Sequence, residues 1–277
     1  MKISLDLASS SSRKMMLLAP SGSAAYRFFE QTRIDPVRYR HLLADLQSLR
    51  GRVYLQDGAI QPQHLIGRKH QLHGDEKCWH LLVLDEEDRV SGCIRCQEYP
   101  DDIEFSQLGV SNAELANCNQ WGATFRNAVE AELSLSRRLG RSYAEVGGWA
   151  LSERIRGTVE ALRLVLASYA LAEKLGGWVV LSTATHRNGS ASILKRIGGR
   201  PLEYQNSQLP SYHDPKYGCE MEILRFYSWA PSPRFGRWVS ELKTQLRKIP
   251  VLAGATPMPA FLPGSGFQAK AAAAGAR

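Results

Sequence analysis

The spacing of hydrophobic and polar residues along the chain predicts a mixed α/β fold. Apolar side chains recur at helical spacing through 36–50, and Asp35 followed by Pro36 is typical of a helix N-terminus. A shorter helix is expected over 24–32 and a short strand over 52–55. The first fifth of the chain is therefore expected to be mainly helical.

The next part of the chain has the pattern of a β-hairpin followed by a helix. Apolar-rich runs over 78–84 and 89–98 flank an acidic segment, 85–88, which indicates two antiparallel strands joined by an acidic turn. A helical pattern then covers 112–139.

A strand–helix–strand pattern follows, with strands expected over 142–151 and 178–185 and a helix over 158–175. This unit is long enough for a parallel crossover. Ligands of such units bind at the carboxyl ends of the strands. The loops 152–157 and 186–190 therefore lie at a candidate binding site.

The last part of the chain is expected to add a short helix over 188–197, a strand over 220–229 and an amphipathic helix over 235–246. From residue 250 onward proline, glycine and alanine dominate, which predicts a disordered tail. The predicted organisation is an N-terminal helical extension (1–50), one α/β domain (51–249) and the tail (250–277).

Composition narrows the class of partner. The 277-residue chain has a formal net charge of +8, which favours an anionic partner such as a phosphorylated co-substrate, an acidic carrier protein, nucleic acid or a membrane surface. No nucleic-acid-binding motif is present, so no nucleic-acid partner is expected. No run approaches the ~20 apolar residues of a membrane span. The five scattered cysteines suggest a reducing, cytoplasmic location.

The turn between the predicted crossover strand and helix has the residues of a phosphate-binding site. Arg154, Arg156, Gly157 and Thr158 lie where a helix begins. The first N–H groups of a helix have no partner within it, and the helix dipole makes that end positive. The alternative is a surface turn with two solvated arginines.

The strand before this turn contains Gly147 and Gly148, and glycine within a strand often marks a bulge. A bulge would free an N–H to contact a carbonyl oxygen, whereas the alternative is packing against Trp149. Glu145 shares a strand face with Gly147 and Trp149 by alternation. Partial burial would raise its pKa and suit a general base, while the alternative is a surface carboxylate.

Other polar residues near the two loops have a functional and a structural interpretation. Ser182 and Thr183 could hydrogen-bond a substrate or only nearby backbone, and Asn188 could contact a ligand or only cap its helix. Cys93 and Cys96 form a C-x-x-C, which invites a zinc interpretation. Residues three apart on a strand face opposite sides, so no metal is expected.

The turn and the segment after it resemble the GNAT acyltransferase superfamily, which binds the diphosphate of acyl-CoA on a Q/R-x-x-G-x-G/A turn. Arg154 and Gly157 match that motif, and Val159 departs from it. The segment from Asn188 to the glycine turn after 197 is similar to the family's final helix. Leu194 stands where that helix often carries a tyrosine acid.

The hairpin resembles that of acyl-homoserine-lactone synthases and long-chain N-acyl amino acid synthases, which implies a bacterial protein similar to autoinducer synthases. Arg95 matches the arginine of that hairpin and Glu145 the glutamate of the following strand. Gly148 replaces the arginine usual three positions later.

The resemblance implies a GNAT-like mixed, twisted sheet flanked by helices, and transfer of an acyl group from acyl-CoA or acyl-carrier protein to an amine, with an amino acid or a derivative as acceptor. It implies no tightly bound cofactor and makes Glu145 the catalytic residue. The residues expected to bind the donor are Gly147, Gly148, Trp149, Leu151, Arg154, Arg156, Gly157, Thr158 and Asn188. The residues expected to bind the other substrate are Arg95, Ser182 and Thr183.

Two other functions are compatible with the same sequence. A non-catalytic GNAT-like module would bind acyl-CoA but lack the chemistry, and Leu194 and Val159 favour it. A basic nucleic-acid or membrane binder would use the net charge. The sequence does not identify the acyl chain length, the amine or the oligomeric state.

Overall fold

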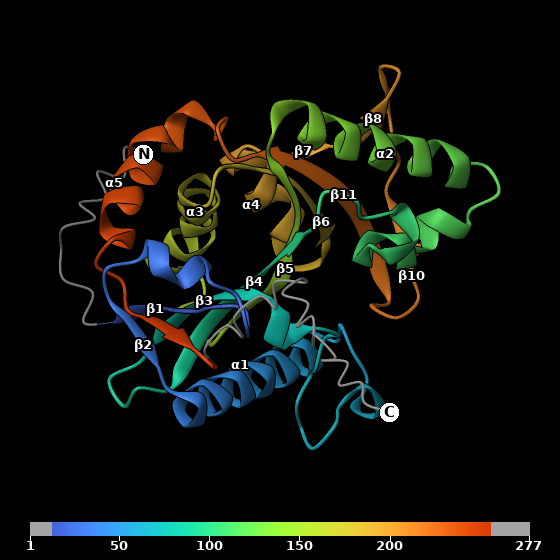
Figure 1. The fold of residues 1–277 in the computed structure, drawn as a ribbon. Coiled ribbons are helices and arrows are strands. Elements are labelled where there is room, and N and C mark those ends of the chain that lie inside the picture. The colour runs from blue at the N-terminus through green and yellow to red at the C-terminus, as the bar shows by residue number, and fades with distance from the viewer. Residues whose placement is uncertain (1–12, 256–277) are drawn as a thin grey trace, which may run out of the picture.

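The computed structural model describes residues 13–255, which form a large twisted mixed sheet flanked by helices (Figure 1). The order of the sheet is β10-β11-β6-β5-β4-β3-β1-β12-β2, with β7 paired to β11. The strands of this sheet are β1 (Lys14–Leu18), β2 (Thr32–Ile34), β3 (Trp79–Leu84), β4 (Val90–Tyr99), β5 (Ser142–Leu151), β6 (Trp178–Thr185), β7 (Arg200–Pro201), β10 (Tyr212–Asp214), β11 (Cys219–Tyr227) and β12 (Val251–Ala253). A separate two-stranded ribbon joins β8 (Glu203–Tyr204) and β9 (Ser207–Gln208).

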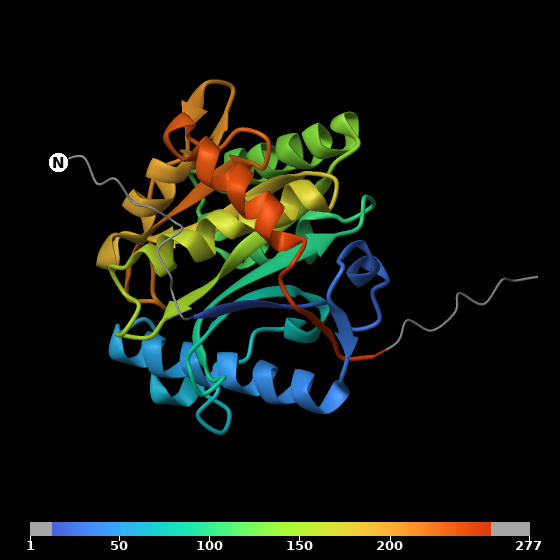
Figure 2. The same ribbon diagram turned by 90° about the vertical axis from the view of Figure 1, so that its left-hand side faces the viewer.

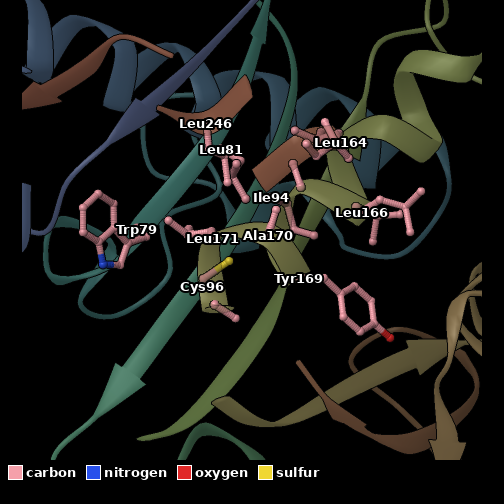
Figure 3. Packing of buried hydrophobic residues seen from close by; sticks show 14 of the residues in the cluster. Trp79, Leu81, Ile94, Cys96, Leu164, Leu166, Tyr169, Ala170, Leu171 and Leu246 are labelled. Carbon is pink, nitrogen blue, oxygen red and sulfur yellow. The ribbon is translucent and has the colours of Figure 1, made fainter. Parts of the chain in front are cut away.

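The helices cover both faces of the sheet. The helices are α1 (Pro36–Gln56), α2 (Gly122–Leu139), α3 (Val159–Lys174), α4 (Ser190–Ile197) and α5 (Gly236–Leu246). Figure 2 shows α1 below the sheet and α3 and α5 above it. Figure 3 shows side chains of β3 and β4, such as Leu81 and Ile94, directed toward Leu164 and Ala170 of α3. Apolar burial on both faces therefore explains why the strands are rich in apolar residues.

Two neighbouring strands diverge in the middle of the sheet. The parallel strands β5 and β6 pair over Ser142–Glu145 and Trp178–Leu181, and beyond that point β6 pairs only with β11. On its other side β5 carries a bulge, since Cys93 pairs with Ala150 but Arg95 pairs with Gly147. Gly148 has a φ of +62° within the bulge. The bulge predicted from the two glycines is confirmed.

Most of the elements expected from the sequence are present. The hairpin, the parallel crossover and α5 lie close to their predicted positions. Asp35 caps α1, because its Oδ1 accepts a 3.0 Å hydrogen bond from the backbone N–H of Arg38.

Several expectations about the first half of the chain are wrong. Residues 52–55 are the last turns of α1, because Val53 is buried against the core and burial decides the outcome over strand propensity. In place of the helix expected over 24–32 there is a 3-10 helix (Ala25–Phe28) followed by the start of β2, and 112–121 contains short 3-10 turns before α2 begins. The unassigned apolar run 15–18 is most of β1, whose leucines are fully buried.

The start of the expected tail is also wrong, since residues 251–253 are strand β12, between β1 and β2. The rest of the tail, from residue 256, lies outside the described residues. The boundaries at 50 and 249 stay predictions, and the sheet takes strands from both sides of each. Within residues 13–255, no helix has the length and apolarity needed to cross a membrane.

Candidate active site where β5 and β6 diverge

Two cavities meet where β5 and β6 diverge. The larger, of about 640 Å³, lies between the turn that precedes α3, helix α4 and the start of α5, and we call it the large cavity. The second, of about 150 Å³, extends from the β5 bulge to β6 and the segment before β11, and we call it the bulge cavity. Asp57, Trp149 and Ser190 line both. The two spaces therefore adjoin at these three residues.

The turn before α3 is held by one buried side chain. Ile155 is fully buried and lies so close to β4 that a Cβ added to Gly92 would be 2.7 Å from its Cδ1. The hydroxyl of Thr158 donates to the carbonyl of Ile155 at 2.8 Å, and Gly157 has a φ of +70°. Gly157 and Thr158 line the large cavity, beside the unpaired N–H groups that a helix has in its first turn. Binding of an anion at this helix start stays a prediction.

The two arginines of this turn differ in their surroundings. Arg156 lines the large cavity, but its guanidinium makes a bidentate pair with Asp57, with two N–O distances of 2.8 Å. Arg154 is exposed and is not among the residues lining the large cavity. Binding of a phosphate by either arginine stays a prediction.

Two other arginines line the large cavity, Arg196 of α4 and Arg234 before α5. The sequence motif did not identify them, because they lie far from the turn along the chain and only the fold brings them near it. Apolar walls come from Trp149, Leu151, Leu162, Phe235 and Trp238. The large cavity therefore combines an apolar wall with exposed cations.

A buried ion-pair cluster supports the bulge. Arg50 is fully buried and donates to both carboxylate oxygens of Asp75, and the Nε of Arg95 lies 3.3 Å from the same carboxylate. Burial by itself would raise the pKa of Asp75, but the Arg50 guanidinium lowers it below its ordinary value. Arg95 also donates to the carbonyl of His73 and lines neither cavity. The expected substrate contact of Arg95 stays a prediction, and the guanidinium contacts Asp75 and the carbonyl of His73.

Glu145 lies deeper in the sheet than the bulge. Its carboxylate accepts hydrogen bonds from the Tyr99 hydroxyl at 3.1 Å and from the backbone N–H of Val110 at 3.0 Å. Burial raises its pKa, and these donors offset part of that effect. A raised pKa suits a general base, but Glu145 lines neither cavity. Its catalytic role stays a prediction.

The other residues expected at the site line different cavities. Ser182 is buried and Thr183 is exposed, and both line the bulge cavity. Gly147 and Gly148 line the same cavity, whereas Leu151 lines the large cavity. Asn188 belongs to a 3-10 helix (Arg187–Gly189), and its side chain lies outside what the structure describes. Substrate contacts of these residues stay predictions.

Two tyrosines that the sequence did not single out line the bulge cavity, Tyr54 near the end of α1 and Tyr217 before β11. Burial raises the pKa of both phenols, so they keep their protons at neutral pH. Leu194, which replaces the tyrosine expected from the resemblance, lines the same cavity. Tyr54 was missed because its segment was expected to be a strand.

The C-x-x-C pair lies on opposite faces of β4, as alternation predicted. Cys93 packs in the apolar cluster between the sheet and α1, and Cys96 packs in the apolar cluster between the sheet and α3. Among residues 13–255, no group of three or more His, Cys, Asp or Glu side chains is arranged to hold a metal ion.

Comparisons with known proteins concern the fold. No family model and no curated protein sequence match this chain. A CoA-dependent acyl-homoserine lactone synthase, BjaI, solved with SAM and isopentyl-CoA, is similar over 86% of this chain and 93% of its own, with 15% identity and a TM-score of 0.50. FeeM, an N-acyl amino acid synthase from uncultured soil microbes, covers 78% and 91% at 12% identity and a TM-score of 0.46. The similarity to BjaI and the twisted mixed sheet flanked by helices confirm the fold expected from the sequence.

Proposed function

We propose that this protein is an N-acyltransferase that moves an acyl group from acyl-CoA or acyl-carrier protein to the amine of an amino acid or a derivative. The observation that carries the proposal is the meeting of two cavities at a glycine bulge, beside the N-terminus of α3. The large cavity suits a long phosphorylated donor, and the bulge cavity suits a small acceptor. The similar fold of BjaI, which holds isopentyl-CoA, supports this assignment.

The large cavity is the proposed donor site. The first turn of α3 would hold the donor's phosphate groups, with Arg196 and Arg234 as additional cations. The apolar wall of Trp149 and Leu162 suits the pantetheine arm. A buried Trp149 Nε1 has no hydrogen-bond partner among the described residues, so it could donate to an amide or thioester oxygen of the donor.

The proposed reaction needs an oxyanion donor, a base and an acid. The neutral amine attacks the thioester carbonyl, the C–S bond breaks, and an amide and a free thiol are formed. A backbone N–H of the bulge would stabilise the oxyanion. Glu145 would receive the amine's proton through water, since it lines neither cavity. The phenol of Tyr54 or Tyr217 would protonate the thiolate.

The space available for the acyl group favours a short chain. A small cavity of about 30 Å³ adjoins the bulge cavity at Ser182 and Leu194 and is closed by Trp178 and Phe226. Such a volume holds about two water molecules. An acyl group of more than a few carbons would require these aromatic side chains to move.

The test is product formation from defined donors and acceptors. Acetyl-, butyryl- and octanoyl-CoA are each incubated with the twenty amino acids and with their decarboxylated amines, and amides and free CoA are quantified by mass spectrometry and a thiol reagent. We expect amide product, with acetyl-CoA used about tenfold or more faster than octanoyl-CoA. Acyl-carrier protein is assayed in parallel as donor.

The non-catalytic module predicts a different result in the same assay. Acetyl-CoA would raise the melting temperature, yet no donor and amine would give product. Leu194, in the position of the expected tyrosine, favours this second function. Product formation excludes it, and binding without any turnover contradicts the proposed enzyme.

A further inference from the structure

The bulge cavity carries one carboxylate and one guanidinium, Asp57 and Arg187. We propose that Asp57 binds the ammonium group and Arg187 the carboxylate of an α-amino acid acceptor. This inference rests on the proposed function, and it assigns acceptor recognition to Asp57, directly after α1, and to Arg187, in the loop 186–190.

Asp57 lies at the junction of the two cavities. Among the described residues that line either of them, Asp57 is the only acidic one. Each of its oxygens accepts one 2.8 Å bond from Arg156. A carboxylate has about four lone-pair sites, so both oxygens can accept a further N–H. The pair with Arg156 also fixes the direction of the carboxylate.

The position of Asp57 suits the reacting amine. Asp57 follows the last residue of α1, and its backbone N–H donates to the carbonyls of Leu55 and Val53. An ammonium group held by Asp57 would lie beside Trp149 and the bulge, where the thioester of the donor is proposed to be. Holding two reactants in contact removes much of the entropic cost of their encounter.

Arg187 is fixed by three backbone carbonyls. Its Nη1 donates to Asp57 at 3.1 Å and to Gly58 at 2.8 Å, and its Nη2 donates to Gly218 at 2.6 Å. A guanidinium has five N–H donors, so two remain beyond these three bonds. A planar guanidinium with a fixed direction is well suited to a carboxylate.

The remaining lining suits an amino acid with an apolar or aromatic side chain. Tyr54, Tyr217 and Met221 line the same cavity, whose volume is about 150 Å³. Opposite charges in one small space favour a zwitterion over a simple amine, because a simple amine leaves the guanidinium without its anion.

The test compares matched acceptors that differ only in the carboxylate. L-Phenylalanine is compared with phenethylamine, and L-leucine with isopentylamine, using acetyl-CoA as donor. We expect wild type to favour each amino acid by about tenfold or more in kcat/KM. Arg187→Gln should reduce this preference to about threefold or less, and Arg187→Lys should restore part of it.

Two further variants separate recognition from structure. Asp57→Asn should raise the acceptor KM about tenfold for the amino acids and the amines alike, with acetyl-CoA affinity little changed. Arg156→Gln breaks the same ion pair but leaves the Asp57 carboxylate, so it should keep the preference for amino acids. Calorimetric binding of L-phenylalanine to each variant provides a readout independent of turnover.

Each outcome bears on one proposal. Equal use of amino acids and amines by wild type, or an unchanged preference in Arg187→Gln, overturns the inference while the proposed acyltransferase stands. An equal rise of acceptor KM in Asp57→Asn and Arg156→Gln would make Asp57 only a support for Arg156. Absence of product from every amine with wild type contradicts the proposed function itself.

Discussion

Single residues decide the shape of the site, and Gly148 is the clearest case. Its φ of +62° is in the left-handed region, and an added Cβ would lie 3.2 Å from Nη1 of Arg50 and 3.3 Å from Cβ of Arg95. Gly147 has no such restriction, since nothing lies within 4 Å of its added Cβ. The buried cluster of Arg50, Asp75 and Arg95 therefore depends on glycine at position 148.

We expect Gly148→Ala to lower the free energy of unfolding by about 1–3 kcal/mol, because the backbone is strained and the buried arginines must shift. Gly147→Ala is the matched control and should change it by less than about 1 kcal/mol. Urea unfolding of both variants measures the difference. Similar midpoints for the two would show that the bulge tolerates a side chain.

A second residue-scale prediction concerns Glu145. Glu145→Gln should lower turnover about 100-fold or more and remove the acidic limb of the pH–rate profile, because burial raises the pKa of this carboxyl. Tyr99→Phe removes one hydrogen bond to Glu145 but keeps the carboxylate, so its loss of turnover should be far smaller. If both variants lose stability but retain turnover, Glu145 only stabilises the loop at Val110 through its hydrogen bond.

At the scale of elements, the sheet takes strands from distant parts of the chain. β12 lies between β1 and β2 and pairs in parallel with both. Leu252 is 3% exposed and packs in the cluster beneath α1. A three-residue strand close to the described C-terminus therefore completes the core against which α1 is packed.

Leu252→Ala should consequently lower the free energy of unfolding by about 2–4 kcal/mol, through lost burial and a residual cavity. Val37→Ala is the control on α1, because Val37 is 63% exposed, and its effect should be within about 0.5 kcal/mol. Equal midpoints for the two variants in denaturant would mean that β12 adds nothing to stability.

At the scale of the whole molecule, buried ionisable groups couple stability to pH. Burial lowers the pKa of His70 and of His80 to about 4. The unfolded chain takes up these protons as pH falls below about 6.5, but the folded chain does not. The stability that the neutral histidines contribute is therefore present above pH 6.5 and is lost as pH falls toward 4. Burial raises the pKa of Glu145, so its contribution to stability changes with pH in the opposite direction.

The histidine contribution is isolated by comparing wild type with His80→Gln. Between pH 7 and pH 4.5 wild type should lose about 2–3 kcal/mol more than the variant, since one buried histidine no longer titrates. Urea unfolding at several pH values gives the dependence of the free energy of unfolding on pH for wild type and for the variant. Glu145 is present in both proteins and affects both dependences equally. Parallel slopes would contradict the lowered pKa of His80.

The sequence predicted much of the fold because its signals there were local. Period-2 and helical spacing identified β5, α3 and β6, and the two glycines of β5 predicted the bulge. The signals failed where tertiary burial decided the outcome. Residues 52–55 have strand propensity but extend α1, and residues 251–253 follow a proline but complete the sheet.

The same distinction applies to the candidate site. The sequence by itself determined the turn at Gly157 and the bulge at Gly148, and hence the place of the candidate site, since backbone geometry follows from glycine positions. Only the tertiary structure decided which side chains face that place. It engaged Arg95 behind the bulge and brought Asp57 and Arg187 together across 130 positions. Contacts between distant segments depend on the packing of the whole sheet, which no local pattern encodes.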